Sequence, residues 1–310
     1  MILTITLNAA LDRIIFLDEF QPGRVMRAPS MVDKVGGKGL AASVALRTLG
    51  AETVALSFVA GSIGQRLVDL LDDYNIRHDL IWLAGETRLA HVLAEQKTQR
   101  HSHLIVGALP VPPSAWSELL ARYQAHLAQT EWVIAAGSLP PGLADDSYGR
   151  LIALAHAAKV PSLLDLTGRP ARAILPQPPT ILKMNWVEFC HTFEVRAATL
   201  VELHQQAQQV YDQFQLTNLV ITCGEHGILA LTKDGSYLAV GPSQVVANAA
   251  GAGDAASAAL AWRLAQNDSF REALRWAAAV GAAVVLTAGT ADCEPAEVER
   301  LLPRITIQEF

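Results

Sequence analysis

Short apolar runs alternate with segments of helical periodicity along most of this chain, and this alternation constrains the fold more than any other feature. The expected strands are Ile2–Leu7, Val54–Phe58, His78–Leu83, Trp132–Ala136, Ser162–Leu166, Ile181–Met184 and Leu219–Cys223. The expected helices are Lys38–Leu49, Ile63–Tyr74, Ser114–Leu127, Asp146–Ala158, Leu200–Phe214, Asp254–Ala265 and Ser269–Leu286. Over 310 residues, this pattern predicts an α/β fold in one domain (residues 1–310), with a mostly parallel sheet covered by helices on both faces. Runs such as WVIAA and LVITC are apolar throughout, as is typical of strands buried on both sides.

Two segments, at about residues 11–35 and 87–106, break this rhythm because extended patterns follow one another without a long helix between them. Within the second segment, Arg88–Glu95 and His101–Val106 are expected to pair as a hairpin. Together the two segments predict a small β-sheet that projects from the main sheet as a lid or as a dimer contact.

Charge and cysteine content exclude several classes of protein. With 24 Lys and Arg against 30 Asp and Glu, the net charge of −6 disfavours a surface that binds nucleic acid or an anionic membrane. The most apolar stretch, residues 276–288, is shorter than the ~20 residues that cross a bilayer, and the N-terminus lacks the basic region of a signal peptide. The three cysteines lie far apart without a CxxC pattern, which predicts a reduced, cytoplasmic protein.

The segment Asn248–Asp254 (NAAGAGD), followed at once by an Ala-rich helical pattern, is the strongest local signal of a reaction site. Gly251 and Gly253 allow backbone N–H groups to turn toward an anion, and the helix start adds the positive end of its dipole. Asp254 fits as a general base that takes a proton from a hydroxyl while the amides hold a transferring phosphoryl group. The alternative is a glycine turn in which Asp254 merely caps the helix.

Three further glycine-containing motifs stand where a ligand can approach the backbone. In GGKG (36–39), Lys38 opens a helix, which is electrostatically unfavourable unless an anion lies nearby. GSLPPG (137–142) and TCGEHG (222–227) each follow an apolar strand, at the edge of a parallel sheet where ligands collect. The glycines of the second are expected to open space for a nucleotide.

Asn185 and Glu188 follow another apolar strand and are three residues apart. Oxygen ligands with this spacing fit the water shell of one magnesium ion. The alternative is a helix cap beside a solvated glutamate.

Together these motifs resemble those of the PfkB carbohydrate kinases of the ribokinase-like superfamily, and most of all the 1-phosphofructokinase and tagatose-6-phosphate kinase group. The matching stretches follow the family's order and cover essentially the whole chain: TLNAALD (6–12), GGKG (36–39), GETR (85–88), GSLPPG (137–142), KMNWVE (183–188), TCGEHG (222–227) and GAGD (251–254). The resemblance implies a three-layer ribokinase-like sandwich with a small β lid. It also implies transfer of a phosphoryl group from ATP, with Mg²⁺, to a sugar hydroxyl, and a homodimer formed through the lid.

The resemblance also implies roles for individual residues. Asp254 is the base, and the GAGD loop supplies the anion hole through Gly251, Ala252 and Gly253. The residues implied to bind the acceptor are Asp12, Gly37, Lys38, Arg88 and Ser138, with Lys38 and Arg88 on the phosphate it already carries. The residues implied to line the nucleotide site are Thr222, Gly224 and Gly227. Asn185 and Glu188 are implied to organise magnesium.

Departures from the family pattern gather at the acceptor end. Leu40–Ser43 lacks the amide that usually follows GGKG, and Leu89–Val92 lacks the Asn and Lys that usually follow GETR. Each lost charge-assisted contact costs about 1.5–3 kcal/mol of binding. The resemblance implies a phosphorylated ketohexose (fructose 1-phosphate, fructose 6-phosphate or tagatose 6-phosphate) as the acceptor, and the lost contacts leave an unphosphorylated sugar or a nucleoside as the alternative. A protein that binds sugar or nucleotide without catalysis is the remaining alternative.

Overall fold

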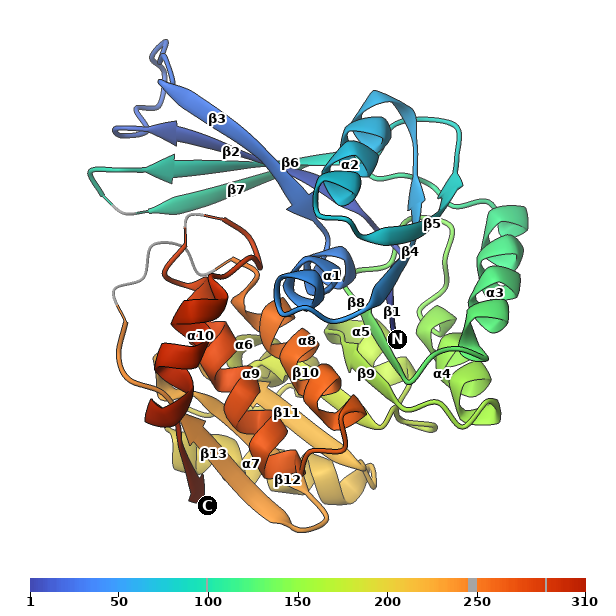
Figure 1. Cartoon of the computed structure of the whole chain (residues 1–310), viewed down its shortest axis with the longest axis vertical. Coiled ribbons are helices and arrows are strands. Elements are labelled where there is room, and N and C mark those ends of the chain that lie inside the picture. The colour runs from blue at the N-terminus through green and yellow to red at the C-terminus, as the bar shows by residue number, and fades with distance from the viewer. Residues whose placement is uncertain (99, 245–249, 288) are drawn as a thin grey trace.

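A computed structural model of the chain describes residues 1–98, 100–244, 250–287 and 289–310 and contains two separate sheets (Figure 1). The larger is ten-stranded, in the order β14-β13-β12-β11-β10-β9-β8-β1-β4-β5. Its strands are, in chain order, β1 (Ile2–Thr6), β4 (Thr53–Val59), β5 (Arg77–Trp82), β8 (Trp132–Ala136), β9 (Ser162–Asp165), β10 (Ile181–Asn185), β11 (Asn218–Thr222), β12 (Ile228–Thr232), β13 (Gly235–Val240) and β14 (Thr306–Glu309). Every neighbouring pair from β5 to β11 is parallel, and the pairs from β11 to β14 are antiparallel.

Helices cover both faces of this sheet, because its buried strands alternate apolar side chains between two cores. In β1, Leu3 and Ile5 face one core, and Ile2 faces the other. The first core packs under α3 (Pro113–Leu127), α4 (Ser147–Ala157), α5 (Gly168–Ala173), α6 (Trp186–Phe193) and α7 (Leu200–Gln213). The second packs under α1 (Lys38–Thr48), α8 (Ala252–Ala265), α9 (Phe270–Val284) and α10 (Pro295–Leu301). The predicted three-layer α/β architecture is confirmed.

The lid is a four-stranded sheet of its own, in the order β3-β2-β6-β7, and projects from one end of the molecule (Figure 1). Its strands are β2 (Ala10–Leu17), β3 (Ser30–Gly36), β6 (Arg88–Glu95) and β7 (His101–Val106). The predicted hairpin has the bounds of β6 and β7, and β2 and β3 account for the segment at 11–35. At its base the lid packs on α2 (Gly61–Asp73), where Leu11 and Val35 share a core with Leu67.

The antiparallel edge β12-β13-β14 is absent from the sequence-based expectations. Its signal is present in the sequence: two short, largely apolar runs, 228–232 and 235–240, are separated only by Lys233 and Asp234, the length of a tight hairpin turn. The short helices α5, α6 and α10 were also not predicted. The predicted helices and strands are otherwise present, with bounds that differ by up to two residues.

Small side chains bring α8 close to its neighbours. Ala255, Ala258 and Ala259 are fully buried in α8, and a side chain at Gly281 of α9 would come within 3.4 Å of the Ala252 carbonyl. The Ala-rich C-terminal part is therefore a packed helix pair. In the described part of the chain, no helix has both the length and the apolar character needed to span a bilayer.

Candidate active site

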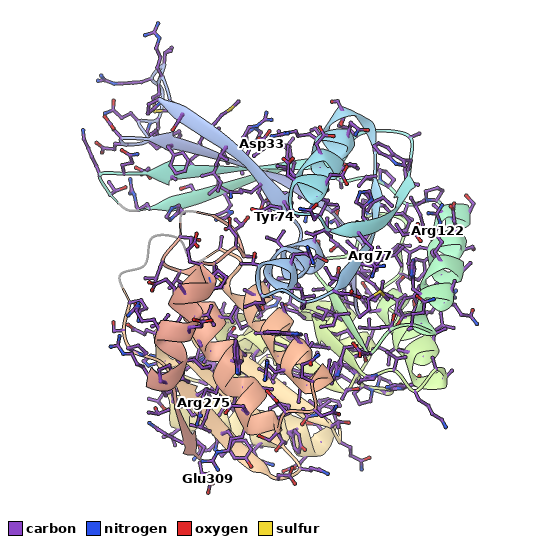
Figure 2. All side chains as sticks on the ribbon, viewed as in Figure 1. Asp33, Tyr74, Arg77, Arg122, Arg275 and Glu309 are labelled. Carbon is purple, nitrogen blue, oxygen red and sulfur yellow. The ribbon has the colours of Figure 1, made fainter. Side chains whose placement is uncertain are left out.

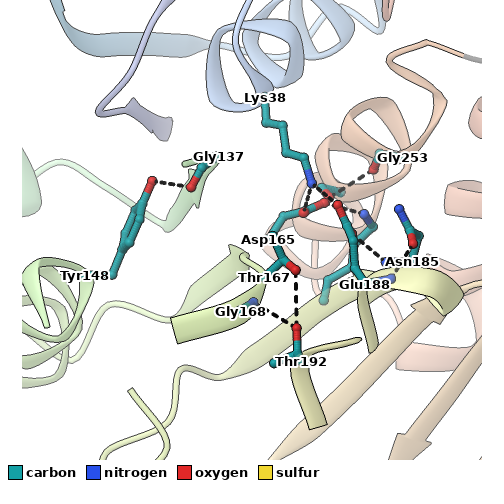
Figure 3. Close-up of polar contacts among 12 residues, drawn as sticks. Lys38, Gly137, Tyr148, Asp165, Thr167, Gly168, Asn185, Glu188, Thr192 and Gly253 are labelled. Carbon is teal, nitrogen blue, oxygen red and sulfur yellow. Dashed lines mark hydrogen bonds and ion pairs between the residues drawn. The ribbon is translucent and has the colours of Figure 1, made fainter. Parts of the chain in front are cut away.

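The candidate site lies at the carboxyl ends of parallel strands, where the segments at the ends of β8, β9 and β10 meet the beginnings of α1 and α8 (Figure 3). Asp165 ends β9, Lys183 lies in β10, and Lys38 is the first residue of α1. Their side chains therefore converge from three elements that are far apart in the sequence.

Asp165 bridges two lysines. Its Oδ1 accepts a hydrogen bond from Lys38 Nζ at 2.6 Å, and its Oδ2 accepts one from Lys183 Nζ at 2.5 Å. The side chains of Asp165 and Lys183 are each 3% exposed, so this ion pair is shielded from water. Lys38 Nζ also donates to Glu188 Oε1 at 3.0 Å. A lysine at a helix start was expected to need an anion nearby, and two carboxylates of the protein itself meet that need.

These ion pairs set the protonation of the cluster. Burial alone would raise the pKa of Asp165, but the charges of Lys183 and Lys38 outweigh it and lower that pKa to about 2. Burial alone would lower the pKa of Lys38, but the carboxylates of Asp165, Asp254 and Glu188 outweigh it and raise that pKa. Both groups are therefore charged at neutral pH.

Asp254 lies in the first turn of α8, and the alternative in which it caps the helix is wrong. Gly251 is the N-cap residue, with φ of 79°, and no side chain caps the helix. Burial, with a further contribution from the charge of Asp165, raises the pKa of Asp254 to about 7. A carboxylate with this pKa, beside the N–H groups of a helix start, has the properties of a general base next to an anion site. Asn248 and Ala249 of the predicted motif lie outside the described residues.

The structure leaves no room for a side chain at Gly251, whereas Gly253 has room for a Cβ atom. A Cβ on Gly251 would lie 2.4 Å from the backbone N of Ala291, so the two backbones are in contact. A Cβ on Gly253 would lie 3.4 Å from Lys183 Nζ, which places the buried ammonium directly against the start of α8.

Asn185 and Glu188 form a capping box at the start of α6. Asn185 Oδ1 accepts from the Glu188 N–H and Glu188 Oε2 accepts from the Asn185 N–H, both at 2.8 Å. The cap alternative is thus confirmed, but the glutamate is not simply solvated because its other oxygen accepts from Lys38. Across residues 1–98, 100–244, 250–287 and 289–310, no three His, Cys, Asp or Glu side chains cluster closely enough to hold a metal ion by themselves.

The residues predicted to bind the acceptor, apart from Lys38, form a second group around the loop after β1. Arg88 donates to the carbonyls of Asn8 (3.0 Å) and Ala9 (3.3 Å), and Asn8 Nδ2 donates to Ser138 Oγ at 3.0 Å. Burial raises the pKa of Asp12 to about 6, against the opposing charge of Arg88.

Glycines give Asp12 and the start of α1 their space. A Cβ on Gly36 would lie 2.3 Å from Asp12 Oδ1, and one on Gly37, with φ of 96°, would lie 2.8 Å from Thr6 Cγ2. Lys38 follows directly, but its ammonium points into the carboxylate cluster (Figure 3). The contacts of Lys38 and Arg88 therefore belong to two different groups in this structure.

The residues predicted to line the nucleotide site follow β11. Thr222 ends the strand, and Gly224 begins a short 3₁₀ turn with φ of 59°. Gly227 has φ of 97°, and a Cβ there would lie 2.0 Å from the carbonyl oxygen of Ala239 in β13. Gly227 is thus required by the packing of the β12-β13 hairpin, whatever it contributes to a ligand site.

Asp165 and Lys183 were missed by reasoning from the sequence. Each is a charged residue in an otherwise apolar strand, SLLD and ILKM, predicted to be buried on both faces. A buried charge requires a partner of opposite sign, and two such strands supply one of each. That pairing rule would have found them.

Comparisons with known proteins agree with this geometry. Residues 5–297 match the model of the pfkB family carbohydrate kinases. The ATP-dependent 6-phosphofructokinase isozyme 2 of Mycobacterium tuberculosis is 29% identical over 96% of this chain and 88% of its own length. The 1-phosphofructokinase of Borreliella burgdorferi is 27% identical over 100% of this chain and 99% of its own.

A solved structure described as a possible 1-phosphofructokinase from Thermotoga maritima has the same fold. Its TM-score is 0.91 at 24% identity, covering 100% of this chain and 99% of that one. The family match spans both the candidate reaction centre and the lid, and the chain belongs to the pfkB family of carbohydrate kinases.

Proposed function

We propose that this protein transfers the γ-phosphoryl group of ATP to a hydroxyl of a phosphorylated ketohexose. The observation that carries the proposal is the arrangement of Asp254, whose pKa is raised to about 7, in the first turn of α8 with two lysine ammonium groups nearby. A protein that only binds has no need of a base at this position. The names of relatives that are phosphofructokinases support the same substrate class.

The reaction follows from these positions. The Asp254 carboxylate takes the proton of the acceptor hydroxyl as its oxygen forms a bond to the γ-phosphorus. The bond between that phosphorus and the oxygen bridging it to the β-phosphate breaks, and ADP leaves with the electron pair. Backbone N–H groups of Ala252 and Gly253, with the dipole of α8, stabilise charge on the transferring group. Positioning and electrostatics supply most of the acceleration.

Magnesium fits the donor set of this site. Glu188 is partly exposed, and its oxygens lie beside Lys38 and the backbone of Asn185. Mg²⁺ typically binds one or two carboxylates together with phosphates and water, so no cage of three protein ligands is needed. Asn185 and Glu188 would hold the ion through its water shell, and bound Mg²⁺ neutralises phosphate charge.

The acceptor is assigned to the group around Asp12, with Gly37 and Ser138 beside it. In this proposal Arg88 and Lys38 hold the phosphate that the sugar already carries. Lys38 would have to leave its carboxylate partners to do so, whereas Arg88 already lies beside Asp12. The nucleotide is assigned to the loop containing Thr222, Gly224 and Gly227.

The test is a coupled ATP-consumption assay with fructose 1-phosphate, fructose 6-phosphate, tagatose 6-phosphate and unphosphorylated sugars. We expect turnover of one of the three phosphates and a loss of roughly 10²–10⁴-fold in Asp254→Asn, with the fold retained. Asp145→Asn, at an exposed carboxylate, is the matched control and keeps full activity. Full activity of Asp254→Asn contradicts the assignment of the base.

The alternatives are separated by the same panel. Turnover of only an unphosphorylated sugar or a nucleoside identifies a kinase of the same fold with a different acceptor. Tight nucleotide binding without ATP consumption on any acceptor identifies a binding protein instead.

We further propose a homodimer formed through the lid, in a cytoplasmic protein with three free thiols. Apolar side chains on the outer strand β7 support the dimer: Leu104, Ile105 and Val106 are 55%, 61% and 59% exposed. Sedimentation is expected to give a dimer for the wild type and a monomer for Ile105→Lys. A monomeric wild type refutes the lid interface.

A further inference from the structure

Three segments of the chain meet in one polar contact at the base of the lid. Lys34 Nζ, from β3, donates to Asp292 Oδ2 at 3.0 Å and lies 3.5 Å from the hydroxyl of Tyr74, which follows α2. The Tyr74 hydroxyl donates to the same Asp292 oxygen at 3.2 Å. Figure 2 shows Tyr74 where the lid meets the body of the molecule. The side chains of Lys34 and Asp292 are 22% and 26% exposed, so water screens their charges only partly.

Asp292 belongs to the loop between α9 and α10, and this loop touches the start of α8. The backbone of Ala291 lies so close to Gly251 that a Cβ on the glycine would be 2.4 Å from the Ala291 nitrogen. Ala291 itself has φ of 62°, and the carbonyl of Asp292 accepts from Thr287 Oγ1 at 3.2 Å. A shift of Asp292 would therefore be transmitted through two adjoining backbones to the N-cap of the helix that carries Asp254.

Lys34 stands at the acceptor end of the site. It pairs in register with Asp12 across β2 and β3, and Gly36, two residues further on, packs against the Asp12 carboxylate. Val35, next to Lys34, accepts from Thr290 Oγ1 at 3.5 Å, a second contact between β3 and the same loop. The strand that borders the acceptor is thus tied to the loop that borders the anion hole.

We propose that the Lys34–Asp292 ion pair is a positioning contact that couples occupancy of the acceptor site to the placement of the GAGD anion hole. The inference rests on the proposed function, because it requires an acceptor that binds beside Asp12. Acceptor binding holds β3 in place, Lys34 holds Asp292, and the loop of Asp292 holds Gly251. Lys34 and Asp292 touch neither substrate in this scheme, so their effect falls on turnover and on binding synergy.

The test compares Lys34→Met, Asp292→Asn and the double variant with Arg13→Met. The control removes an ion pair of similar exposure within the same lid, because Arg13 pairs with Asp33 on β3 and not with the loop. We expect each single variant to lower kcat about 5- to 20-fold, the double variant to be no worse than either, and the control to stay within twofold. Lys34→Arg keeps the ion pair and is expected to restore most of the turnover.

Hydrogen exchange supplies a readout that a loss of stability alone would not produce. Addition of the preferred sugar phosphate without nucleotide is expected to slow amide exchange at residues 250–262 of the wild type and of Arg13→Met. The same addition is expected to leave exchange in that segment unchanged in Lys34→Met and Asp292→Asn. Tyr74→Phe, which keeps the ion pair, serves as a milder variant if Asp292→Asn does not fold, and its response is expected to be intermediate.

Additive losses in the double variant, or a wild-type response in all variants, overturn the inference. A rise in KM for the sugar phosphate in Lys34→Met alone, with Asp292→Asn unaffected, also overturns it, because it marks Lys34 as a direct acceptor contact. A wild type that phosphorylates no sugar phosphate overturns the proposed function and the inference together, whereas an active wild type with unaffected variants overturns the inference alone.

Discussion

Replacement of Asp165 by Asn tests the buried charge cluster most directly. The substitution keeps the shape of the side chain but removes the anion between Lys38 and Lys183. Lys38 retains Glu188, whereas Lys183, with a side chain 3% exposed, loses its ion-pair partner. Breaking a buried ion pair on one side typically costs about 3–5 kcal/mol, because the remaining charge stays out of water.

The expected result is a marked fall in thermal stability at pH 7. At roughly 2.1 cal/mol/K of unfolding entropy per residue, Tm of a 310-residue chain shifts by about 1.5 °C per kcal/mol, so the loss corresponds to roughly 5–8 °C. The pKa of Asp165 is lowered to about 2 in the folded protein, whereas an aspartate in the unfolded chain titrates near 4. The ion pair therefore stabilises the fold fully at pH values above 4. Its contribution is lost as the pH falls from about 4 to about 2, so the difference between variant and wild type narrows there.

Scanning calorimetry or denaturant titration measures this difference, and two further variants make the result specific. Asp165→Asn with Lys183→Met removes both charges and is expected to recover most of the stability. Asp79→Asn is the matched control, because the Asp79 carboxylate also has two side-chain partners, Arg122 and His126, but is 28% exposed. Its cost is expected to be below about 1 kcal/mol. Equal losses in Asp165→Asn and Asp79→Asn, or no recovery in the double variant, would refute the reasoning.

Two further predictions concern single residues of the site. Arg88→Ala is expected to raise KM for a sugar phosphate roughly 10- to 100-fold, the loss of one charge-assisted contact, and to change KM little for an unphosphorylated sugar; steady-state kinetics on both acceptors decides. Burial raises the pKa of Asp254 in the folded protein to about 7, whereas the same carboxyl titrates near 4 in the unfolded chain. The buried negative charge therefore does not destabilise the fold below pH 4, and it destabilises the fold fully above pH 7. Asp254→Asn is therefore expected to raise Tm at pH 8 and to lose this gain as the pH is lowered to 4, and a gain independent of pH contradicts the buried charge.

The alternating strands and helices could be predicted from the sequence because each of them has its own local hydrophobic pattern. WVIAA predicted β8, and the pairing of β6 with β7 followed from two extended runs without a helix between them. The antiparallel edge was not predicted, although β12 and β13 are no shorter than β8, because they follow β11 without a helical segment to mark each new unit. Residue propensity and hydrophobic periodicity do not determine next to which strand, or in which direction, a new strand joins the sheet.

The site residues likewise divide into those that a local pattern predicted and those that it did not. Asp254 was predicted because it follows two closely spaced glycines and begins a helical pattern. A carboxylate at a helix start beside an anion site fits a general base. The partners of Lys38 were not predicted, because Asp165 and Glu188 are 127 and 150 residues away along the chain. Which charges meet is decided by strand order, and strand order is a property of the whole chain.

Among the residues that the structure describes, the two sheets share no ladder of hydrogen bonds, and each sheet supplies a different part of the proposed site. Asp12 and Arg88 come from the four-stranded sheet, whereas Asp165, Lys183 and the start of α8 belong to the ten-stranded body. Lid substitutions that leave Lys34 in place are thus expected to reshape the proposed acceptor pocket, while the groups proposed to handle the phosphoryl donor keep their places. A chimaera that carries the lid of a relative on this body, with Lys34 retained, is accordingly a direct route to changing which sugar is phosphorylated.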